Sequence, residues 1–152
     1  MAILLDGTND LVSFGDAAGV DGAAALTVMF WYKPAAWNSL DGLLTKGSQA
    51  TFYLIQGITA GADALRWTQG VGNTAETGAT DFPVGEEHHL AVVFDGAGAS
   101  NVDRLKIFKD GVDLTLTYAG TIPATITTSS GAALELGVNR DNAAFGNFTA
   151  SH

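Results

Sequence analysis

The chain has 152 residues, 47% of them hydrophobic and 15% charged, which suits one domain with a real core and excludes a disordered chain. A net charge of −9 without any basic cluster excludes nucleic-acid binding, because such binding needs Lys and Arg to neutralise phosphates. The absence of cysteine excludes disulfides, thiol chemistry and thiolate metal sites.

The first predicted strands are residues 2–5 and 11–14, on either side of a turn. Residues 25–33 predict a long strand with apolar side chains on both faces, so we expect a central strand that Pro34 terminates. Asp-Gly pairs predict type I′ hairpin turns, since both residues tolerate positive φ angles. These pairs begin at Asp6, Asp21, Asp41, Asp95 and Asp110.

Further strands are predicted along the rest of the chain, at residues 51–56, 64–69, 88–95, 104–109, 112–118 and 133–138. No stretch has a sustained helical period of apolar residues with caps, so little helix is expected. Regularly spaced strands with turn signals between them are typical of a sandwich or barrel. The sequence therefore predicts one all-β domain over residues 1–152.

The N-terminal segment MAILLDGTND lacks the basic region and the long apolar stretch of a secretory signal peptide. No apolar run approaches the about 18–20 residues that a membrane span requires. We therefore expect a chain that is made in a cytoplasm and has no membrane span.

A series of short motifs runs through the chain in a characteristic order: LDGTNDLVSF (5–14), LTVMFWYKP (26–34), GLLTKG (42–47), EEHHLAVVFDG (86–96), RLKIFKDGVDL (104–114) and ALELGVNRDN (133–142). Together they resemble the laminin G-like domains of the concanavalin A-like lectin/glucanase superfamily, over residues 3–145. The resemblance implies an antiparallel β-sandwich with the jelly-roll topology. Glu87 departs from the pattern, because the family usually has a Trp at that place.

The family's terminal strand has no clear counterpart in the last segment, FGNFTASH (145–152). In this jelly roll that strand lies beside the early strands, so its absence would leave an open sheet edge unless residues 145–150 replace it. Open edges pair with other chains, so we expect a homo-oligomer or an assembly with other proteins.

Short laminin G-like proteins that open with a segment like MAILLDGTND (1–10) resemble structural proteins of bacteriophages. The resemblance therefore implies a non-catalytic structural or adhesion protein of the virion, such as a capsid decoration or tail protein. Such a protein would be made in the host cytoplasm, be located in the virion and have other virion proteins as partners.

The alternative function is a lectin-like carbohydrate-binding module with glycans as partners and calcium as an optional cofactor. Its candidate ligand-binding residues are Trp37, as an aromatic platform in a loop, and the loop residues Asn139, Arg140, Asp141 and Asn142. Calcium prefers clustered oxygen ligands. The candidate ligands are Asp6, Asn9, Asp10, Asp141 and Asn142. A competing interpretation, which we favour, is that these side chains only stabilise turns and that no metal or cofactor binds.

No catalytic residue is expected. None of the four glutamates stands in the E-x-D-x-x-E pattern of the glucanases in this superfamily. His88 and His89 are neighbours on a predicted strand, so they point to opposite faces and do not share one metal site. Trp31 and Trp67 lie in predicted strands and are expected in the core.

Overall fold

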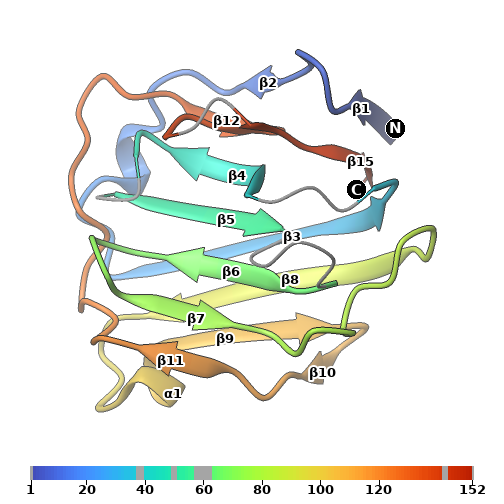
Figure 1. Cartoon of the computed structure of the whole chain (residues 1–152). Coiled ribbons are helices and arrows are strands. Elements are labelled where there is room, and N and C mark those ends of the chain that lie inside the picture. The colour runs from blue at the N-terminus through green and yellow to red at the C-terminus, as the bar shows by residue number, and fades with distance from the viewer. Residues whose placement is uncertain (1, 37–39, 49–50, 57–62, 142–143, 152) are drawn as a thin grey trace.

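The computed structural model describes residues 2–36, 40–48, 51–56, 63–141 and 144–151, which form two sheets packed face to face (Figure 1). The six-stranded sheet has the spatial order β1 (Ala2–Asp6), β15 (Asn147–Ser151), β3 (Ala25–Pro34), β8 (His88–Asp95), β9 (Leu105–Lys109) and β10 (Val112–Asp113). All pairings within this sheet are antiparallel.

The nine-stranded sheet follows the path β11 (Thr117–Ala119), β7 (Thr74–Glu76), β6 (Leu65–Thr68), β5 (Phe52–Gln56), β4 (Asp41–Lys46), β12 (Leu134–Leu136) and β2 (Val12–Ser13). Two short strands lie beside this path, β13 (Val138–Asn139) and β14 (Ala144–Phe145). They pair with each other, and β14 also pairs in parallel with β4. The predicted antiparallel β-sandwich is therefore confirmed.

Helix is confined, within the described residues, to a 3-10 turn at Ala18–Val20 and to α1 (Asn101–Arg104). The capping box of Ser100 and Asp103 explains where α1 begins, because each side chain accepts a backbone N–H of the other residue. Neither of these short elements is long and apolar enough to cross a membrane.

The core lies between the two sheets and is rich in aromatic rings. Phe52 and Trp67 stack with their ring centroids 4.8 Å apart, and Tyr32 meets Phe148 edge to face at 5.4 Å. Trp67 is thus in the core, as predicted. Burying each such side chain stabilises the fold by about 1.5–3 kcal/mol, which makes this aromatic cluster a main source of cohesion between the sheets.

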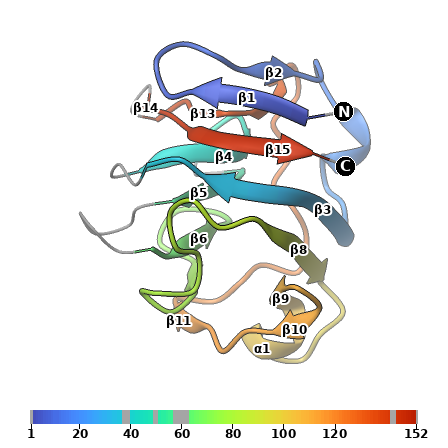
Figure 2. The same ribbon diagram turned by 90° about the vertical axis from the view of Figure 1, so that its right-hand side faces the viewer.

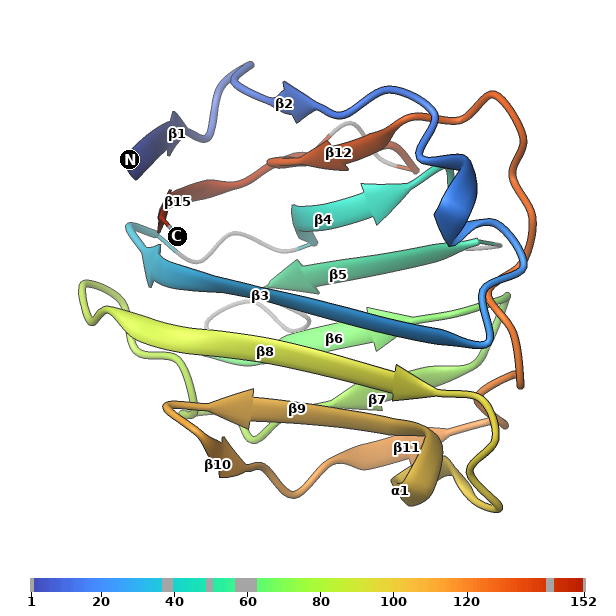
Figure 3. The same cartoon turned by 180° about the vertical axis from the view of Figure 1, so that it is seen from behind.

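Strand β3 is central in its sheet, between β15 and β8, but only one of its faces is covered. Its inner side chains pack on the core, whereas Met29 and Trp31 on the outer face are 60% and 42% exposed. The prediction that Trp31 lies in the core is therefore wrong. In a sandwich of two layers, the outer face of even a central strand meets solvent, as the view from behind shows (Figure 3).

The last strand, β15, closes the gap that the sequence predicted at the sheet edge. It pairs with β1 on one side and with β3 on the other (Figure 2). Phe148 stands opposite Leu5 and Pro34 in these registers, and its side chain is completely buried. Residues 147–151 thus replace the terminal strand of the family, and the expected open edge does not exist.

Several predicted turns and strands differ from the structure. Among the Asp-Gly pairs, only Asp110-Gly111 has positive φ at both residues (52° and 80°), and it joins β9 to β10 as a hairpin. The predicted strands 2–5 and 11–14 enter different sheets, because β1 pairs with β15 while β2 pairs with β12. Residues 112–118 likewise divide between β10 and β11, which belong to opposite sheets.

The predicted strand 133–138 is interrupted at Gly137, whose φ is 92°. A side chain there would place its Cβ 2.8 Å from Leu5 Cδ1, so both the backbone angle and the space require glycine. The break separates β12, which pairs with β4, from β13, which pairs with β14. This bend brings the loop after β13 back toward β12, where the candidate site lies.

Candidate functional site

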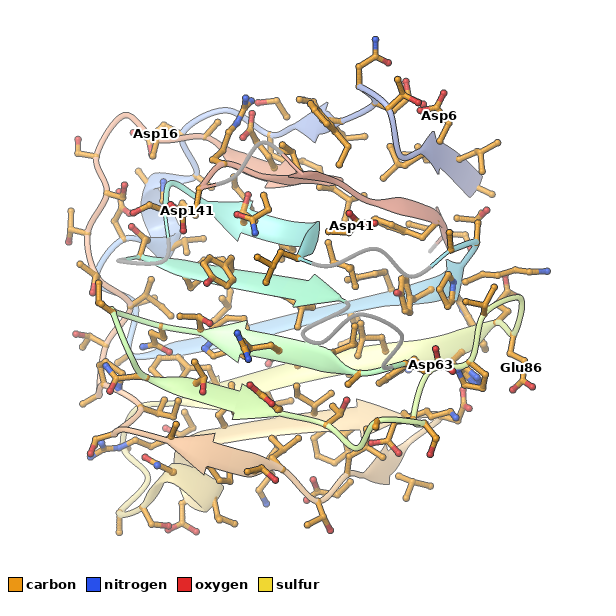
Figure 4. The ribbon with its side chains drawn as sticks, viewed as in Figure 1. Asp6, Asp16, Asp41, Asp63, Glu86 and Asp141 are labelled. Atoms are coloured by element: carbon orange, nitrogen blue, oxygen red, sulfur yellow. The ribbon has the colours of Figure 1, made fainter. Side chains whose placement is uncertain are left out.

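A polar cleft of about 560 Å3 lies at one end of the nine-stranded sheet, beside β4 and β12. Its walls come from the β4–β5 turn, the segment before β12, β12 itself and the loop after β13. Figure 4 shows Asp141 of that loop next to the end of β4. The lining residues are Gly47, Ser48, Ser129, Ala132, Ala133, Glu135, Arg140 and Asp141.

An ion pair between Arg140 and Glu135 forms the chemical centre of the polar cleft. Arg140 Nε donates to Glu135 Oε2 at 2.6 Å, and Nη2 donates to Oε1 of the same carboxylate. The side chain of Arg140 is 49% exposed, whereas that of Glu135 is only 7% exposed. The hydrogen bonds that Arg140 donates to Glu135 raise the pKa of Arg140 above its ordinary value. Two hydrogen bonds between the same two groups fix their orientation more strictly than one would.

A fully buried lysine positions one wall of the cleft. Lys46 Nζ donates to Asp16 Oδ1 and to the carbonyl oxygen of Ala132, both at 2.8 Å, and lies 3.5 Å from Asp21 Oδ1. The same two carboxylates accept backbone N–H groups of the turn at residues 129–131, each at 3.0 Å. This network therefore ties the turn before β12 to the end of β4.

The predicted ligand-binding residues lie in different environments in the structure. Arg140 and Asp141 both line the polar cleft and are exposed. Asn139 is buried, donates from Nδ2 to the carbonyl oxygen of Leu40 at 3.0 Å, and accepts the backbone N–H of Asp141 at 3.1 Å. Asn139 therefore holds the loop in its conformation through these two hydrogen bonds. Trp37 and Asn142 lie outside the described residues.

The candidate calcium ligands near the N-terminus form a turn of their own. Thr8 donates its backbone N–H to Asp6 Oδ1 at 2.8 Å, and Asp6 donates its backbone N–H to Asp10 Oδ2 at 3.2 Å. Asp6 and Asp141 lie at opposite ends of the sandwich, so these two candidates do not meet (Figure 4). Within the described ranges, no three His, Asp or Glu residues cluster as metal ligands. The favoured expectation that no metal binds, and the alternative of a calcium site, both stay predictions.

The adjacent histidines face opposite sides of β8, as predicted. His88 is buried and its Nδ1 lies 2.8 Å from Asp110 Oδ2, beside the β9–β10 hairpin. The ring of His89 meets Trp31 edge on at 5.4 Å on the outer face of the six-stranded sheet. Each therefore has a separate local contact, and they share no cleft.

Sequence reasoning missed Glu135 and Lys46, the two charged side chains that organise the polar cleft. One signal was available for Glu135, because it is the single charged residue in an apolar strand and stands five residues before Arg140. No local signal distinguishes Lys46 from an exposed lysine. Its partners, Asp16, Asp21 and Ala132, are distant in sequence and meet it only in the folded chain.

A second cavity, of about 570 Å3, lies between the sheets and is lined mainly by apolar side chains such as Phe14, Val28, Phe30 and Leu134. Sugars and other polyhydroxylated ligands need hydrogen-bonding partners, which this lining offers sparsely. The polar cleft is therefore the better candidate for a site that binds a polar ligand.

The fold is that of a jelly-roll domain of the concanavalin A-like class. It has two packed sheets, a terminal strand between β1 and β3, and a polar cleft at the end of one sheet. The family model of the concanavalin A-like lectin/glucanases superfamily matches residues 6–150. The chain belongs to this family, as its motifs indicated. No curated protein sequence matches the chain.

Several similar solved structures are domains of a sialidase or an arabinanase. The CBM40 of the Ruminococcus gnavus IT-sialidase, bound to α2,3-sialyllactose, has a TM-score of 0.64 and 16% identity, and the match covers 99% of this chain and 90% of that one. The same module bound to α2,6-sialyllactose has a TM-score of 0.62, 17% identity and the same coverage. Domain 4 of a GH43 extracellular arabinanase from Geobacillus stearothermophilus, in complex with arabinotriose, has a TM-score of 0.54 and 16% identity, and covers 97% of this chain and 78% of that one. At these identities the likeness shows the shared fold.

The interpretation of the chain as a bacteriophage virion component is wrong. The similar structures are carbohydrate-binding domains of a sialidase and an arabinanase, which favours the lectin-like alternative. The structural reason for expecting assembly also fails, because β15 fills the sheet edge that was thought to be open.

Proposed function

We propose that this chain is a non-catalytic carbohydrate-binding domain that holds a glycan in the polar cleft. The observation that carries the proposal is the doubly hydrogen-bonded Arg140–Glu135 pair in a cleft that also contains Ser48, Ser129 and Asp141. Guanidinium N–H groups donate, carboxylates accept and hydroxyls do both, which matches the alternating donors and acceptors of sugar hydroxyls. The glycan complexes of CBM40 and of the arabinanase domain support the same class of ligand.

The size of the cleft agrees with this proposal. A cavity of about 560 Å3 lies within the range of about 300–1,000 Å3 that is typical of small-ligand sites. Its walls are also held in place before any ligand binds, since Lys46 anchors the turn before β12 and Glu135 orients Arg140. A rigid site loses less conformational entropy on binding, which favours affinity.

The chemistry of Glu135 favours binding over hydrolysis. Glycosidases need one carboxylic acid that donates a proton and a second carboxylate at a defined separation. Both oxygens of Glu135 already accept hydrogen bonds from Arg140, so this carboxylate is poorly suited to donate a proton. The cleft therefore has the groups to hold a sugar without the arrangement that cleaves one.

The proposal is tested by isothermal titration calorimetry of the whole chain with arabinotriose and with lactose. We expect saturable binding of at least one of these sugars. Ala133→Trp, which fills the cleft, should weaken it at least tenfold. Ala119→Trp is the matched control, because Ala119 is exposed at the opposite edge of the same sheet.

Thermal melts of both variants separate lost binding from lost folding. Affinity that survives in a folded Ala133→Trp variant would place the glycan elsewhere. A wild-type chain that binds no oligosaccharide at millimolar concentration would refute the carbohydrate-binding function itself.

A further inference from the structure

We infer that the polar cleft selects uncharged glycans and discriminates against glycans that carry a carboxylate or a sulfate. This inference rests on the proposed function and adds the chemical class of its ligand. It also separates this chain from the CBM40 structures of similar fold, whose ligand, sialyllactose, is an anion.

The guanidinium group of Arg140 in the cleft is already hydrogen-bonded to a carboxylate. Arg140 is the single basic residue among the residues that line the cleft, and it directs Nε and Nη2 to both oxygens of Glu135. An anionic sugar that used the same two N–H groups would have to displace Glu135. That carboxylate is 7% exposed and would then be left nearly buried without its partner, which is strongly unfavourable.

Among the described residues around the cleft, no other basic side chain is available to an anionic ligand. Lys46 precedes the cleft residue Gly47, but it is fully buried and its ammonium group is bonded to Asp16 and to the carbonyl oxygen of Ala132. In register Lys46 stands opposite Phe52, a core residue, so its side chain leaves the sheet on the inner face. It is therefore not available to a ligand in the cleft.

The charged side chains that line the cleft carry a net negative charge. Glu135 and Arg140 cancel, and Asp141 adds one further carboxylate, so the lining is negative. The whole chain has a net charge of −9, which repels anionic ligands over a longer range. A carboxylate or sulfate on the ligand is therefore repelled at long range by the net charge of the chain and at short range by the lining of the cleft.

An uncharged sugar meets none of these obstacles. The guanidinium group has five N–H donors, two of which point at Glu135, so others remain for hydroxyl oxygens. The carboxylate oxygens have further lone pairs that accept sugar O–H groups. Neutral hydroxyls thus bind around the ion pair without separating it.

The inference is tested by comparing lactose with 3′-sialyllactose, which contains lactose and adds one carboxylate-bearing sugar. Titration calorimetry of the wild-type chain is done with arabinotriose, lactose and 3′-sialyllactose, at low and at moderate salt. We expect 3′-sialyllactose to bind at least tenfold more weakly than the neutral sugars. Higher salt should narrow this difference, because it screens the exposed Asp141 carboxylate.

Glu135→Gln provides the gain-of-function arm of the test. The substitution keeps the shape of the side chain, removes one negative charge and releases the guanidinium N–H groups of Arg140. We expect at least a tenfold gain in affinity for 3′-sialyllactose. Glu76→Gln is the matched control, since it removes the same charge from the Arg66–Glu76 pair, a similar ion pair on β6 and β7 of the same sheet. This control should leave all affinities unchanged.

A second variant, Asp141→Asn, keeps the test decisive if Glu135→Gln folds poorly, because Asp141 is exposed, lines the cleft and loses one negative charge there. It should also raise the affinity for 3′-sialyllactose. A wild-type chain that binds 3′-sialyllactose as tightly as lactose would overturn the selectivity while leaving glycan binding intact. A chain that binds none of the three sugars would instead refute the proposed function, and the selectivity with it.

Discussion

Lys46 is fully buried, yet its ammonium group contacts oxygen atoms of three residues, Asp16, Asp21 and Ala132. An unpaired charge in such a place would cost several kcal/mol, so the two carboxylates and the carbonyl are what makes its burial tolerable. Because these partners come from near both ends of the chain, one side chain joins the N-terminal segment, β4 and the turn before β12. At the scale of the residue, this contact sets the shape of the cleft wall.

Two carboxylates have lowered pKa values for related reasons. Hydrogen bonds from Lys46 and from a backbone amide lower the pKa of Asp16. Desolvation raises the pKa of Asp110, but the hydrogen bonds from the His89 amide and the His88 ring outweigh it, and the net pKa is also lowered. In both cases the folded chain favours the ionised carboxylate.

These pKa values predict how stability depends on pH. A carboxylate whose pKa is lower in the folded state adds stability that is present above its unfolded pKa, about 3.9, and is lost as pH falls through its folded pKa. Urea unfolding should therefore give a nearly constant free energy between pH 7 and 5 and a falling one below about pH 4. Asp110→Asn should flatten this fall, whereas Asp113→Asn, in an exposed pair 3.8 Å from Lys106, should not. An equal slope in both variants would contradict the assignment.

At the scale of the element, β15 decides whether the six-stranded sheet is continuous. Its five residues pair with β1, four of them also pair with β3, and Phe148 enters the core between Leu5 and Pro34. Its ring also meets Tyr32. A strand that is short and weakly apolar in sequence therefore becomes an interior strand of the sheet.

Phe148→Ala should reduce the free energy of unfolding by about 3–5 kcal/mol, because it opens a cavity in the core. Thr149→Ala is the matched control. Its side chain shares the outer face with exposed Leu4 and Lys33, its partners in register, and its loss should cost less than about 1 kcal/mol. Urea denaturation followed by circular dichroism measures both. Similar losses in the two variants would show that β15 is held by its backbone pairing and that Phe148 adds little.

At the scale of the whole molecule, the sandwich ends in edges that pair poorly with other chains. The edge strands β2 and β10 have two residues each, and short edges offer little for another strand to bind. β11, the other edge of the nine-stranded sheet, has three residues. The longest edge strand, β1, has five residues and pairs on one side with β15. Exposed apolar side chains include Leu4, Phe14 and, on the outer face of β3, Met29 and Trp31.

We therefore expect light scattering of the purified chain to give the mass of one chain at micromolar concentration. A variant that ends at Gly146 lacks β15. The sides of β1 and β3 that pair with β15 would then have no partner, so this variant should self-associate. A stable dimer of the intact chain would disagree with this expectation. Met29→Ser would then show whether the outer face of β3 is the interface.

Local patterns account for much of the fold. Alternating apolar residues placed most strands, because the two-residue period of a strand is written directly in the sequence. The positive φ angles at Asp110-Gly111 agree with the residue types, although the other four Asp-Gly pairs do not have positive φ at both residues. For the candidate site, the loop composition pointed to Arg140 and Asp141, since polar residues after a strand gather at the rim of a sandwich.

The sequence by itself determined the all-β class, the family and two residues of the cleft, since these depend on residue type and short-range period. Tertiary structure alone decided which strands pair, that β15 lies between β1 and β3, that Lys46 is buried and that Trp31 is exposed. It also decided that Glu135 holds Arg140, because that contact depends on the bend at Gly137. For strand pairing and burial, the physical reason is that the contacts join segments far apart in the chain, so no short window of sequence contains both partners. Glu135 and Arg140 do share a short window, but only the bend between them decides that they meet.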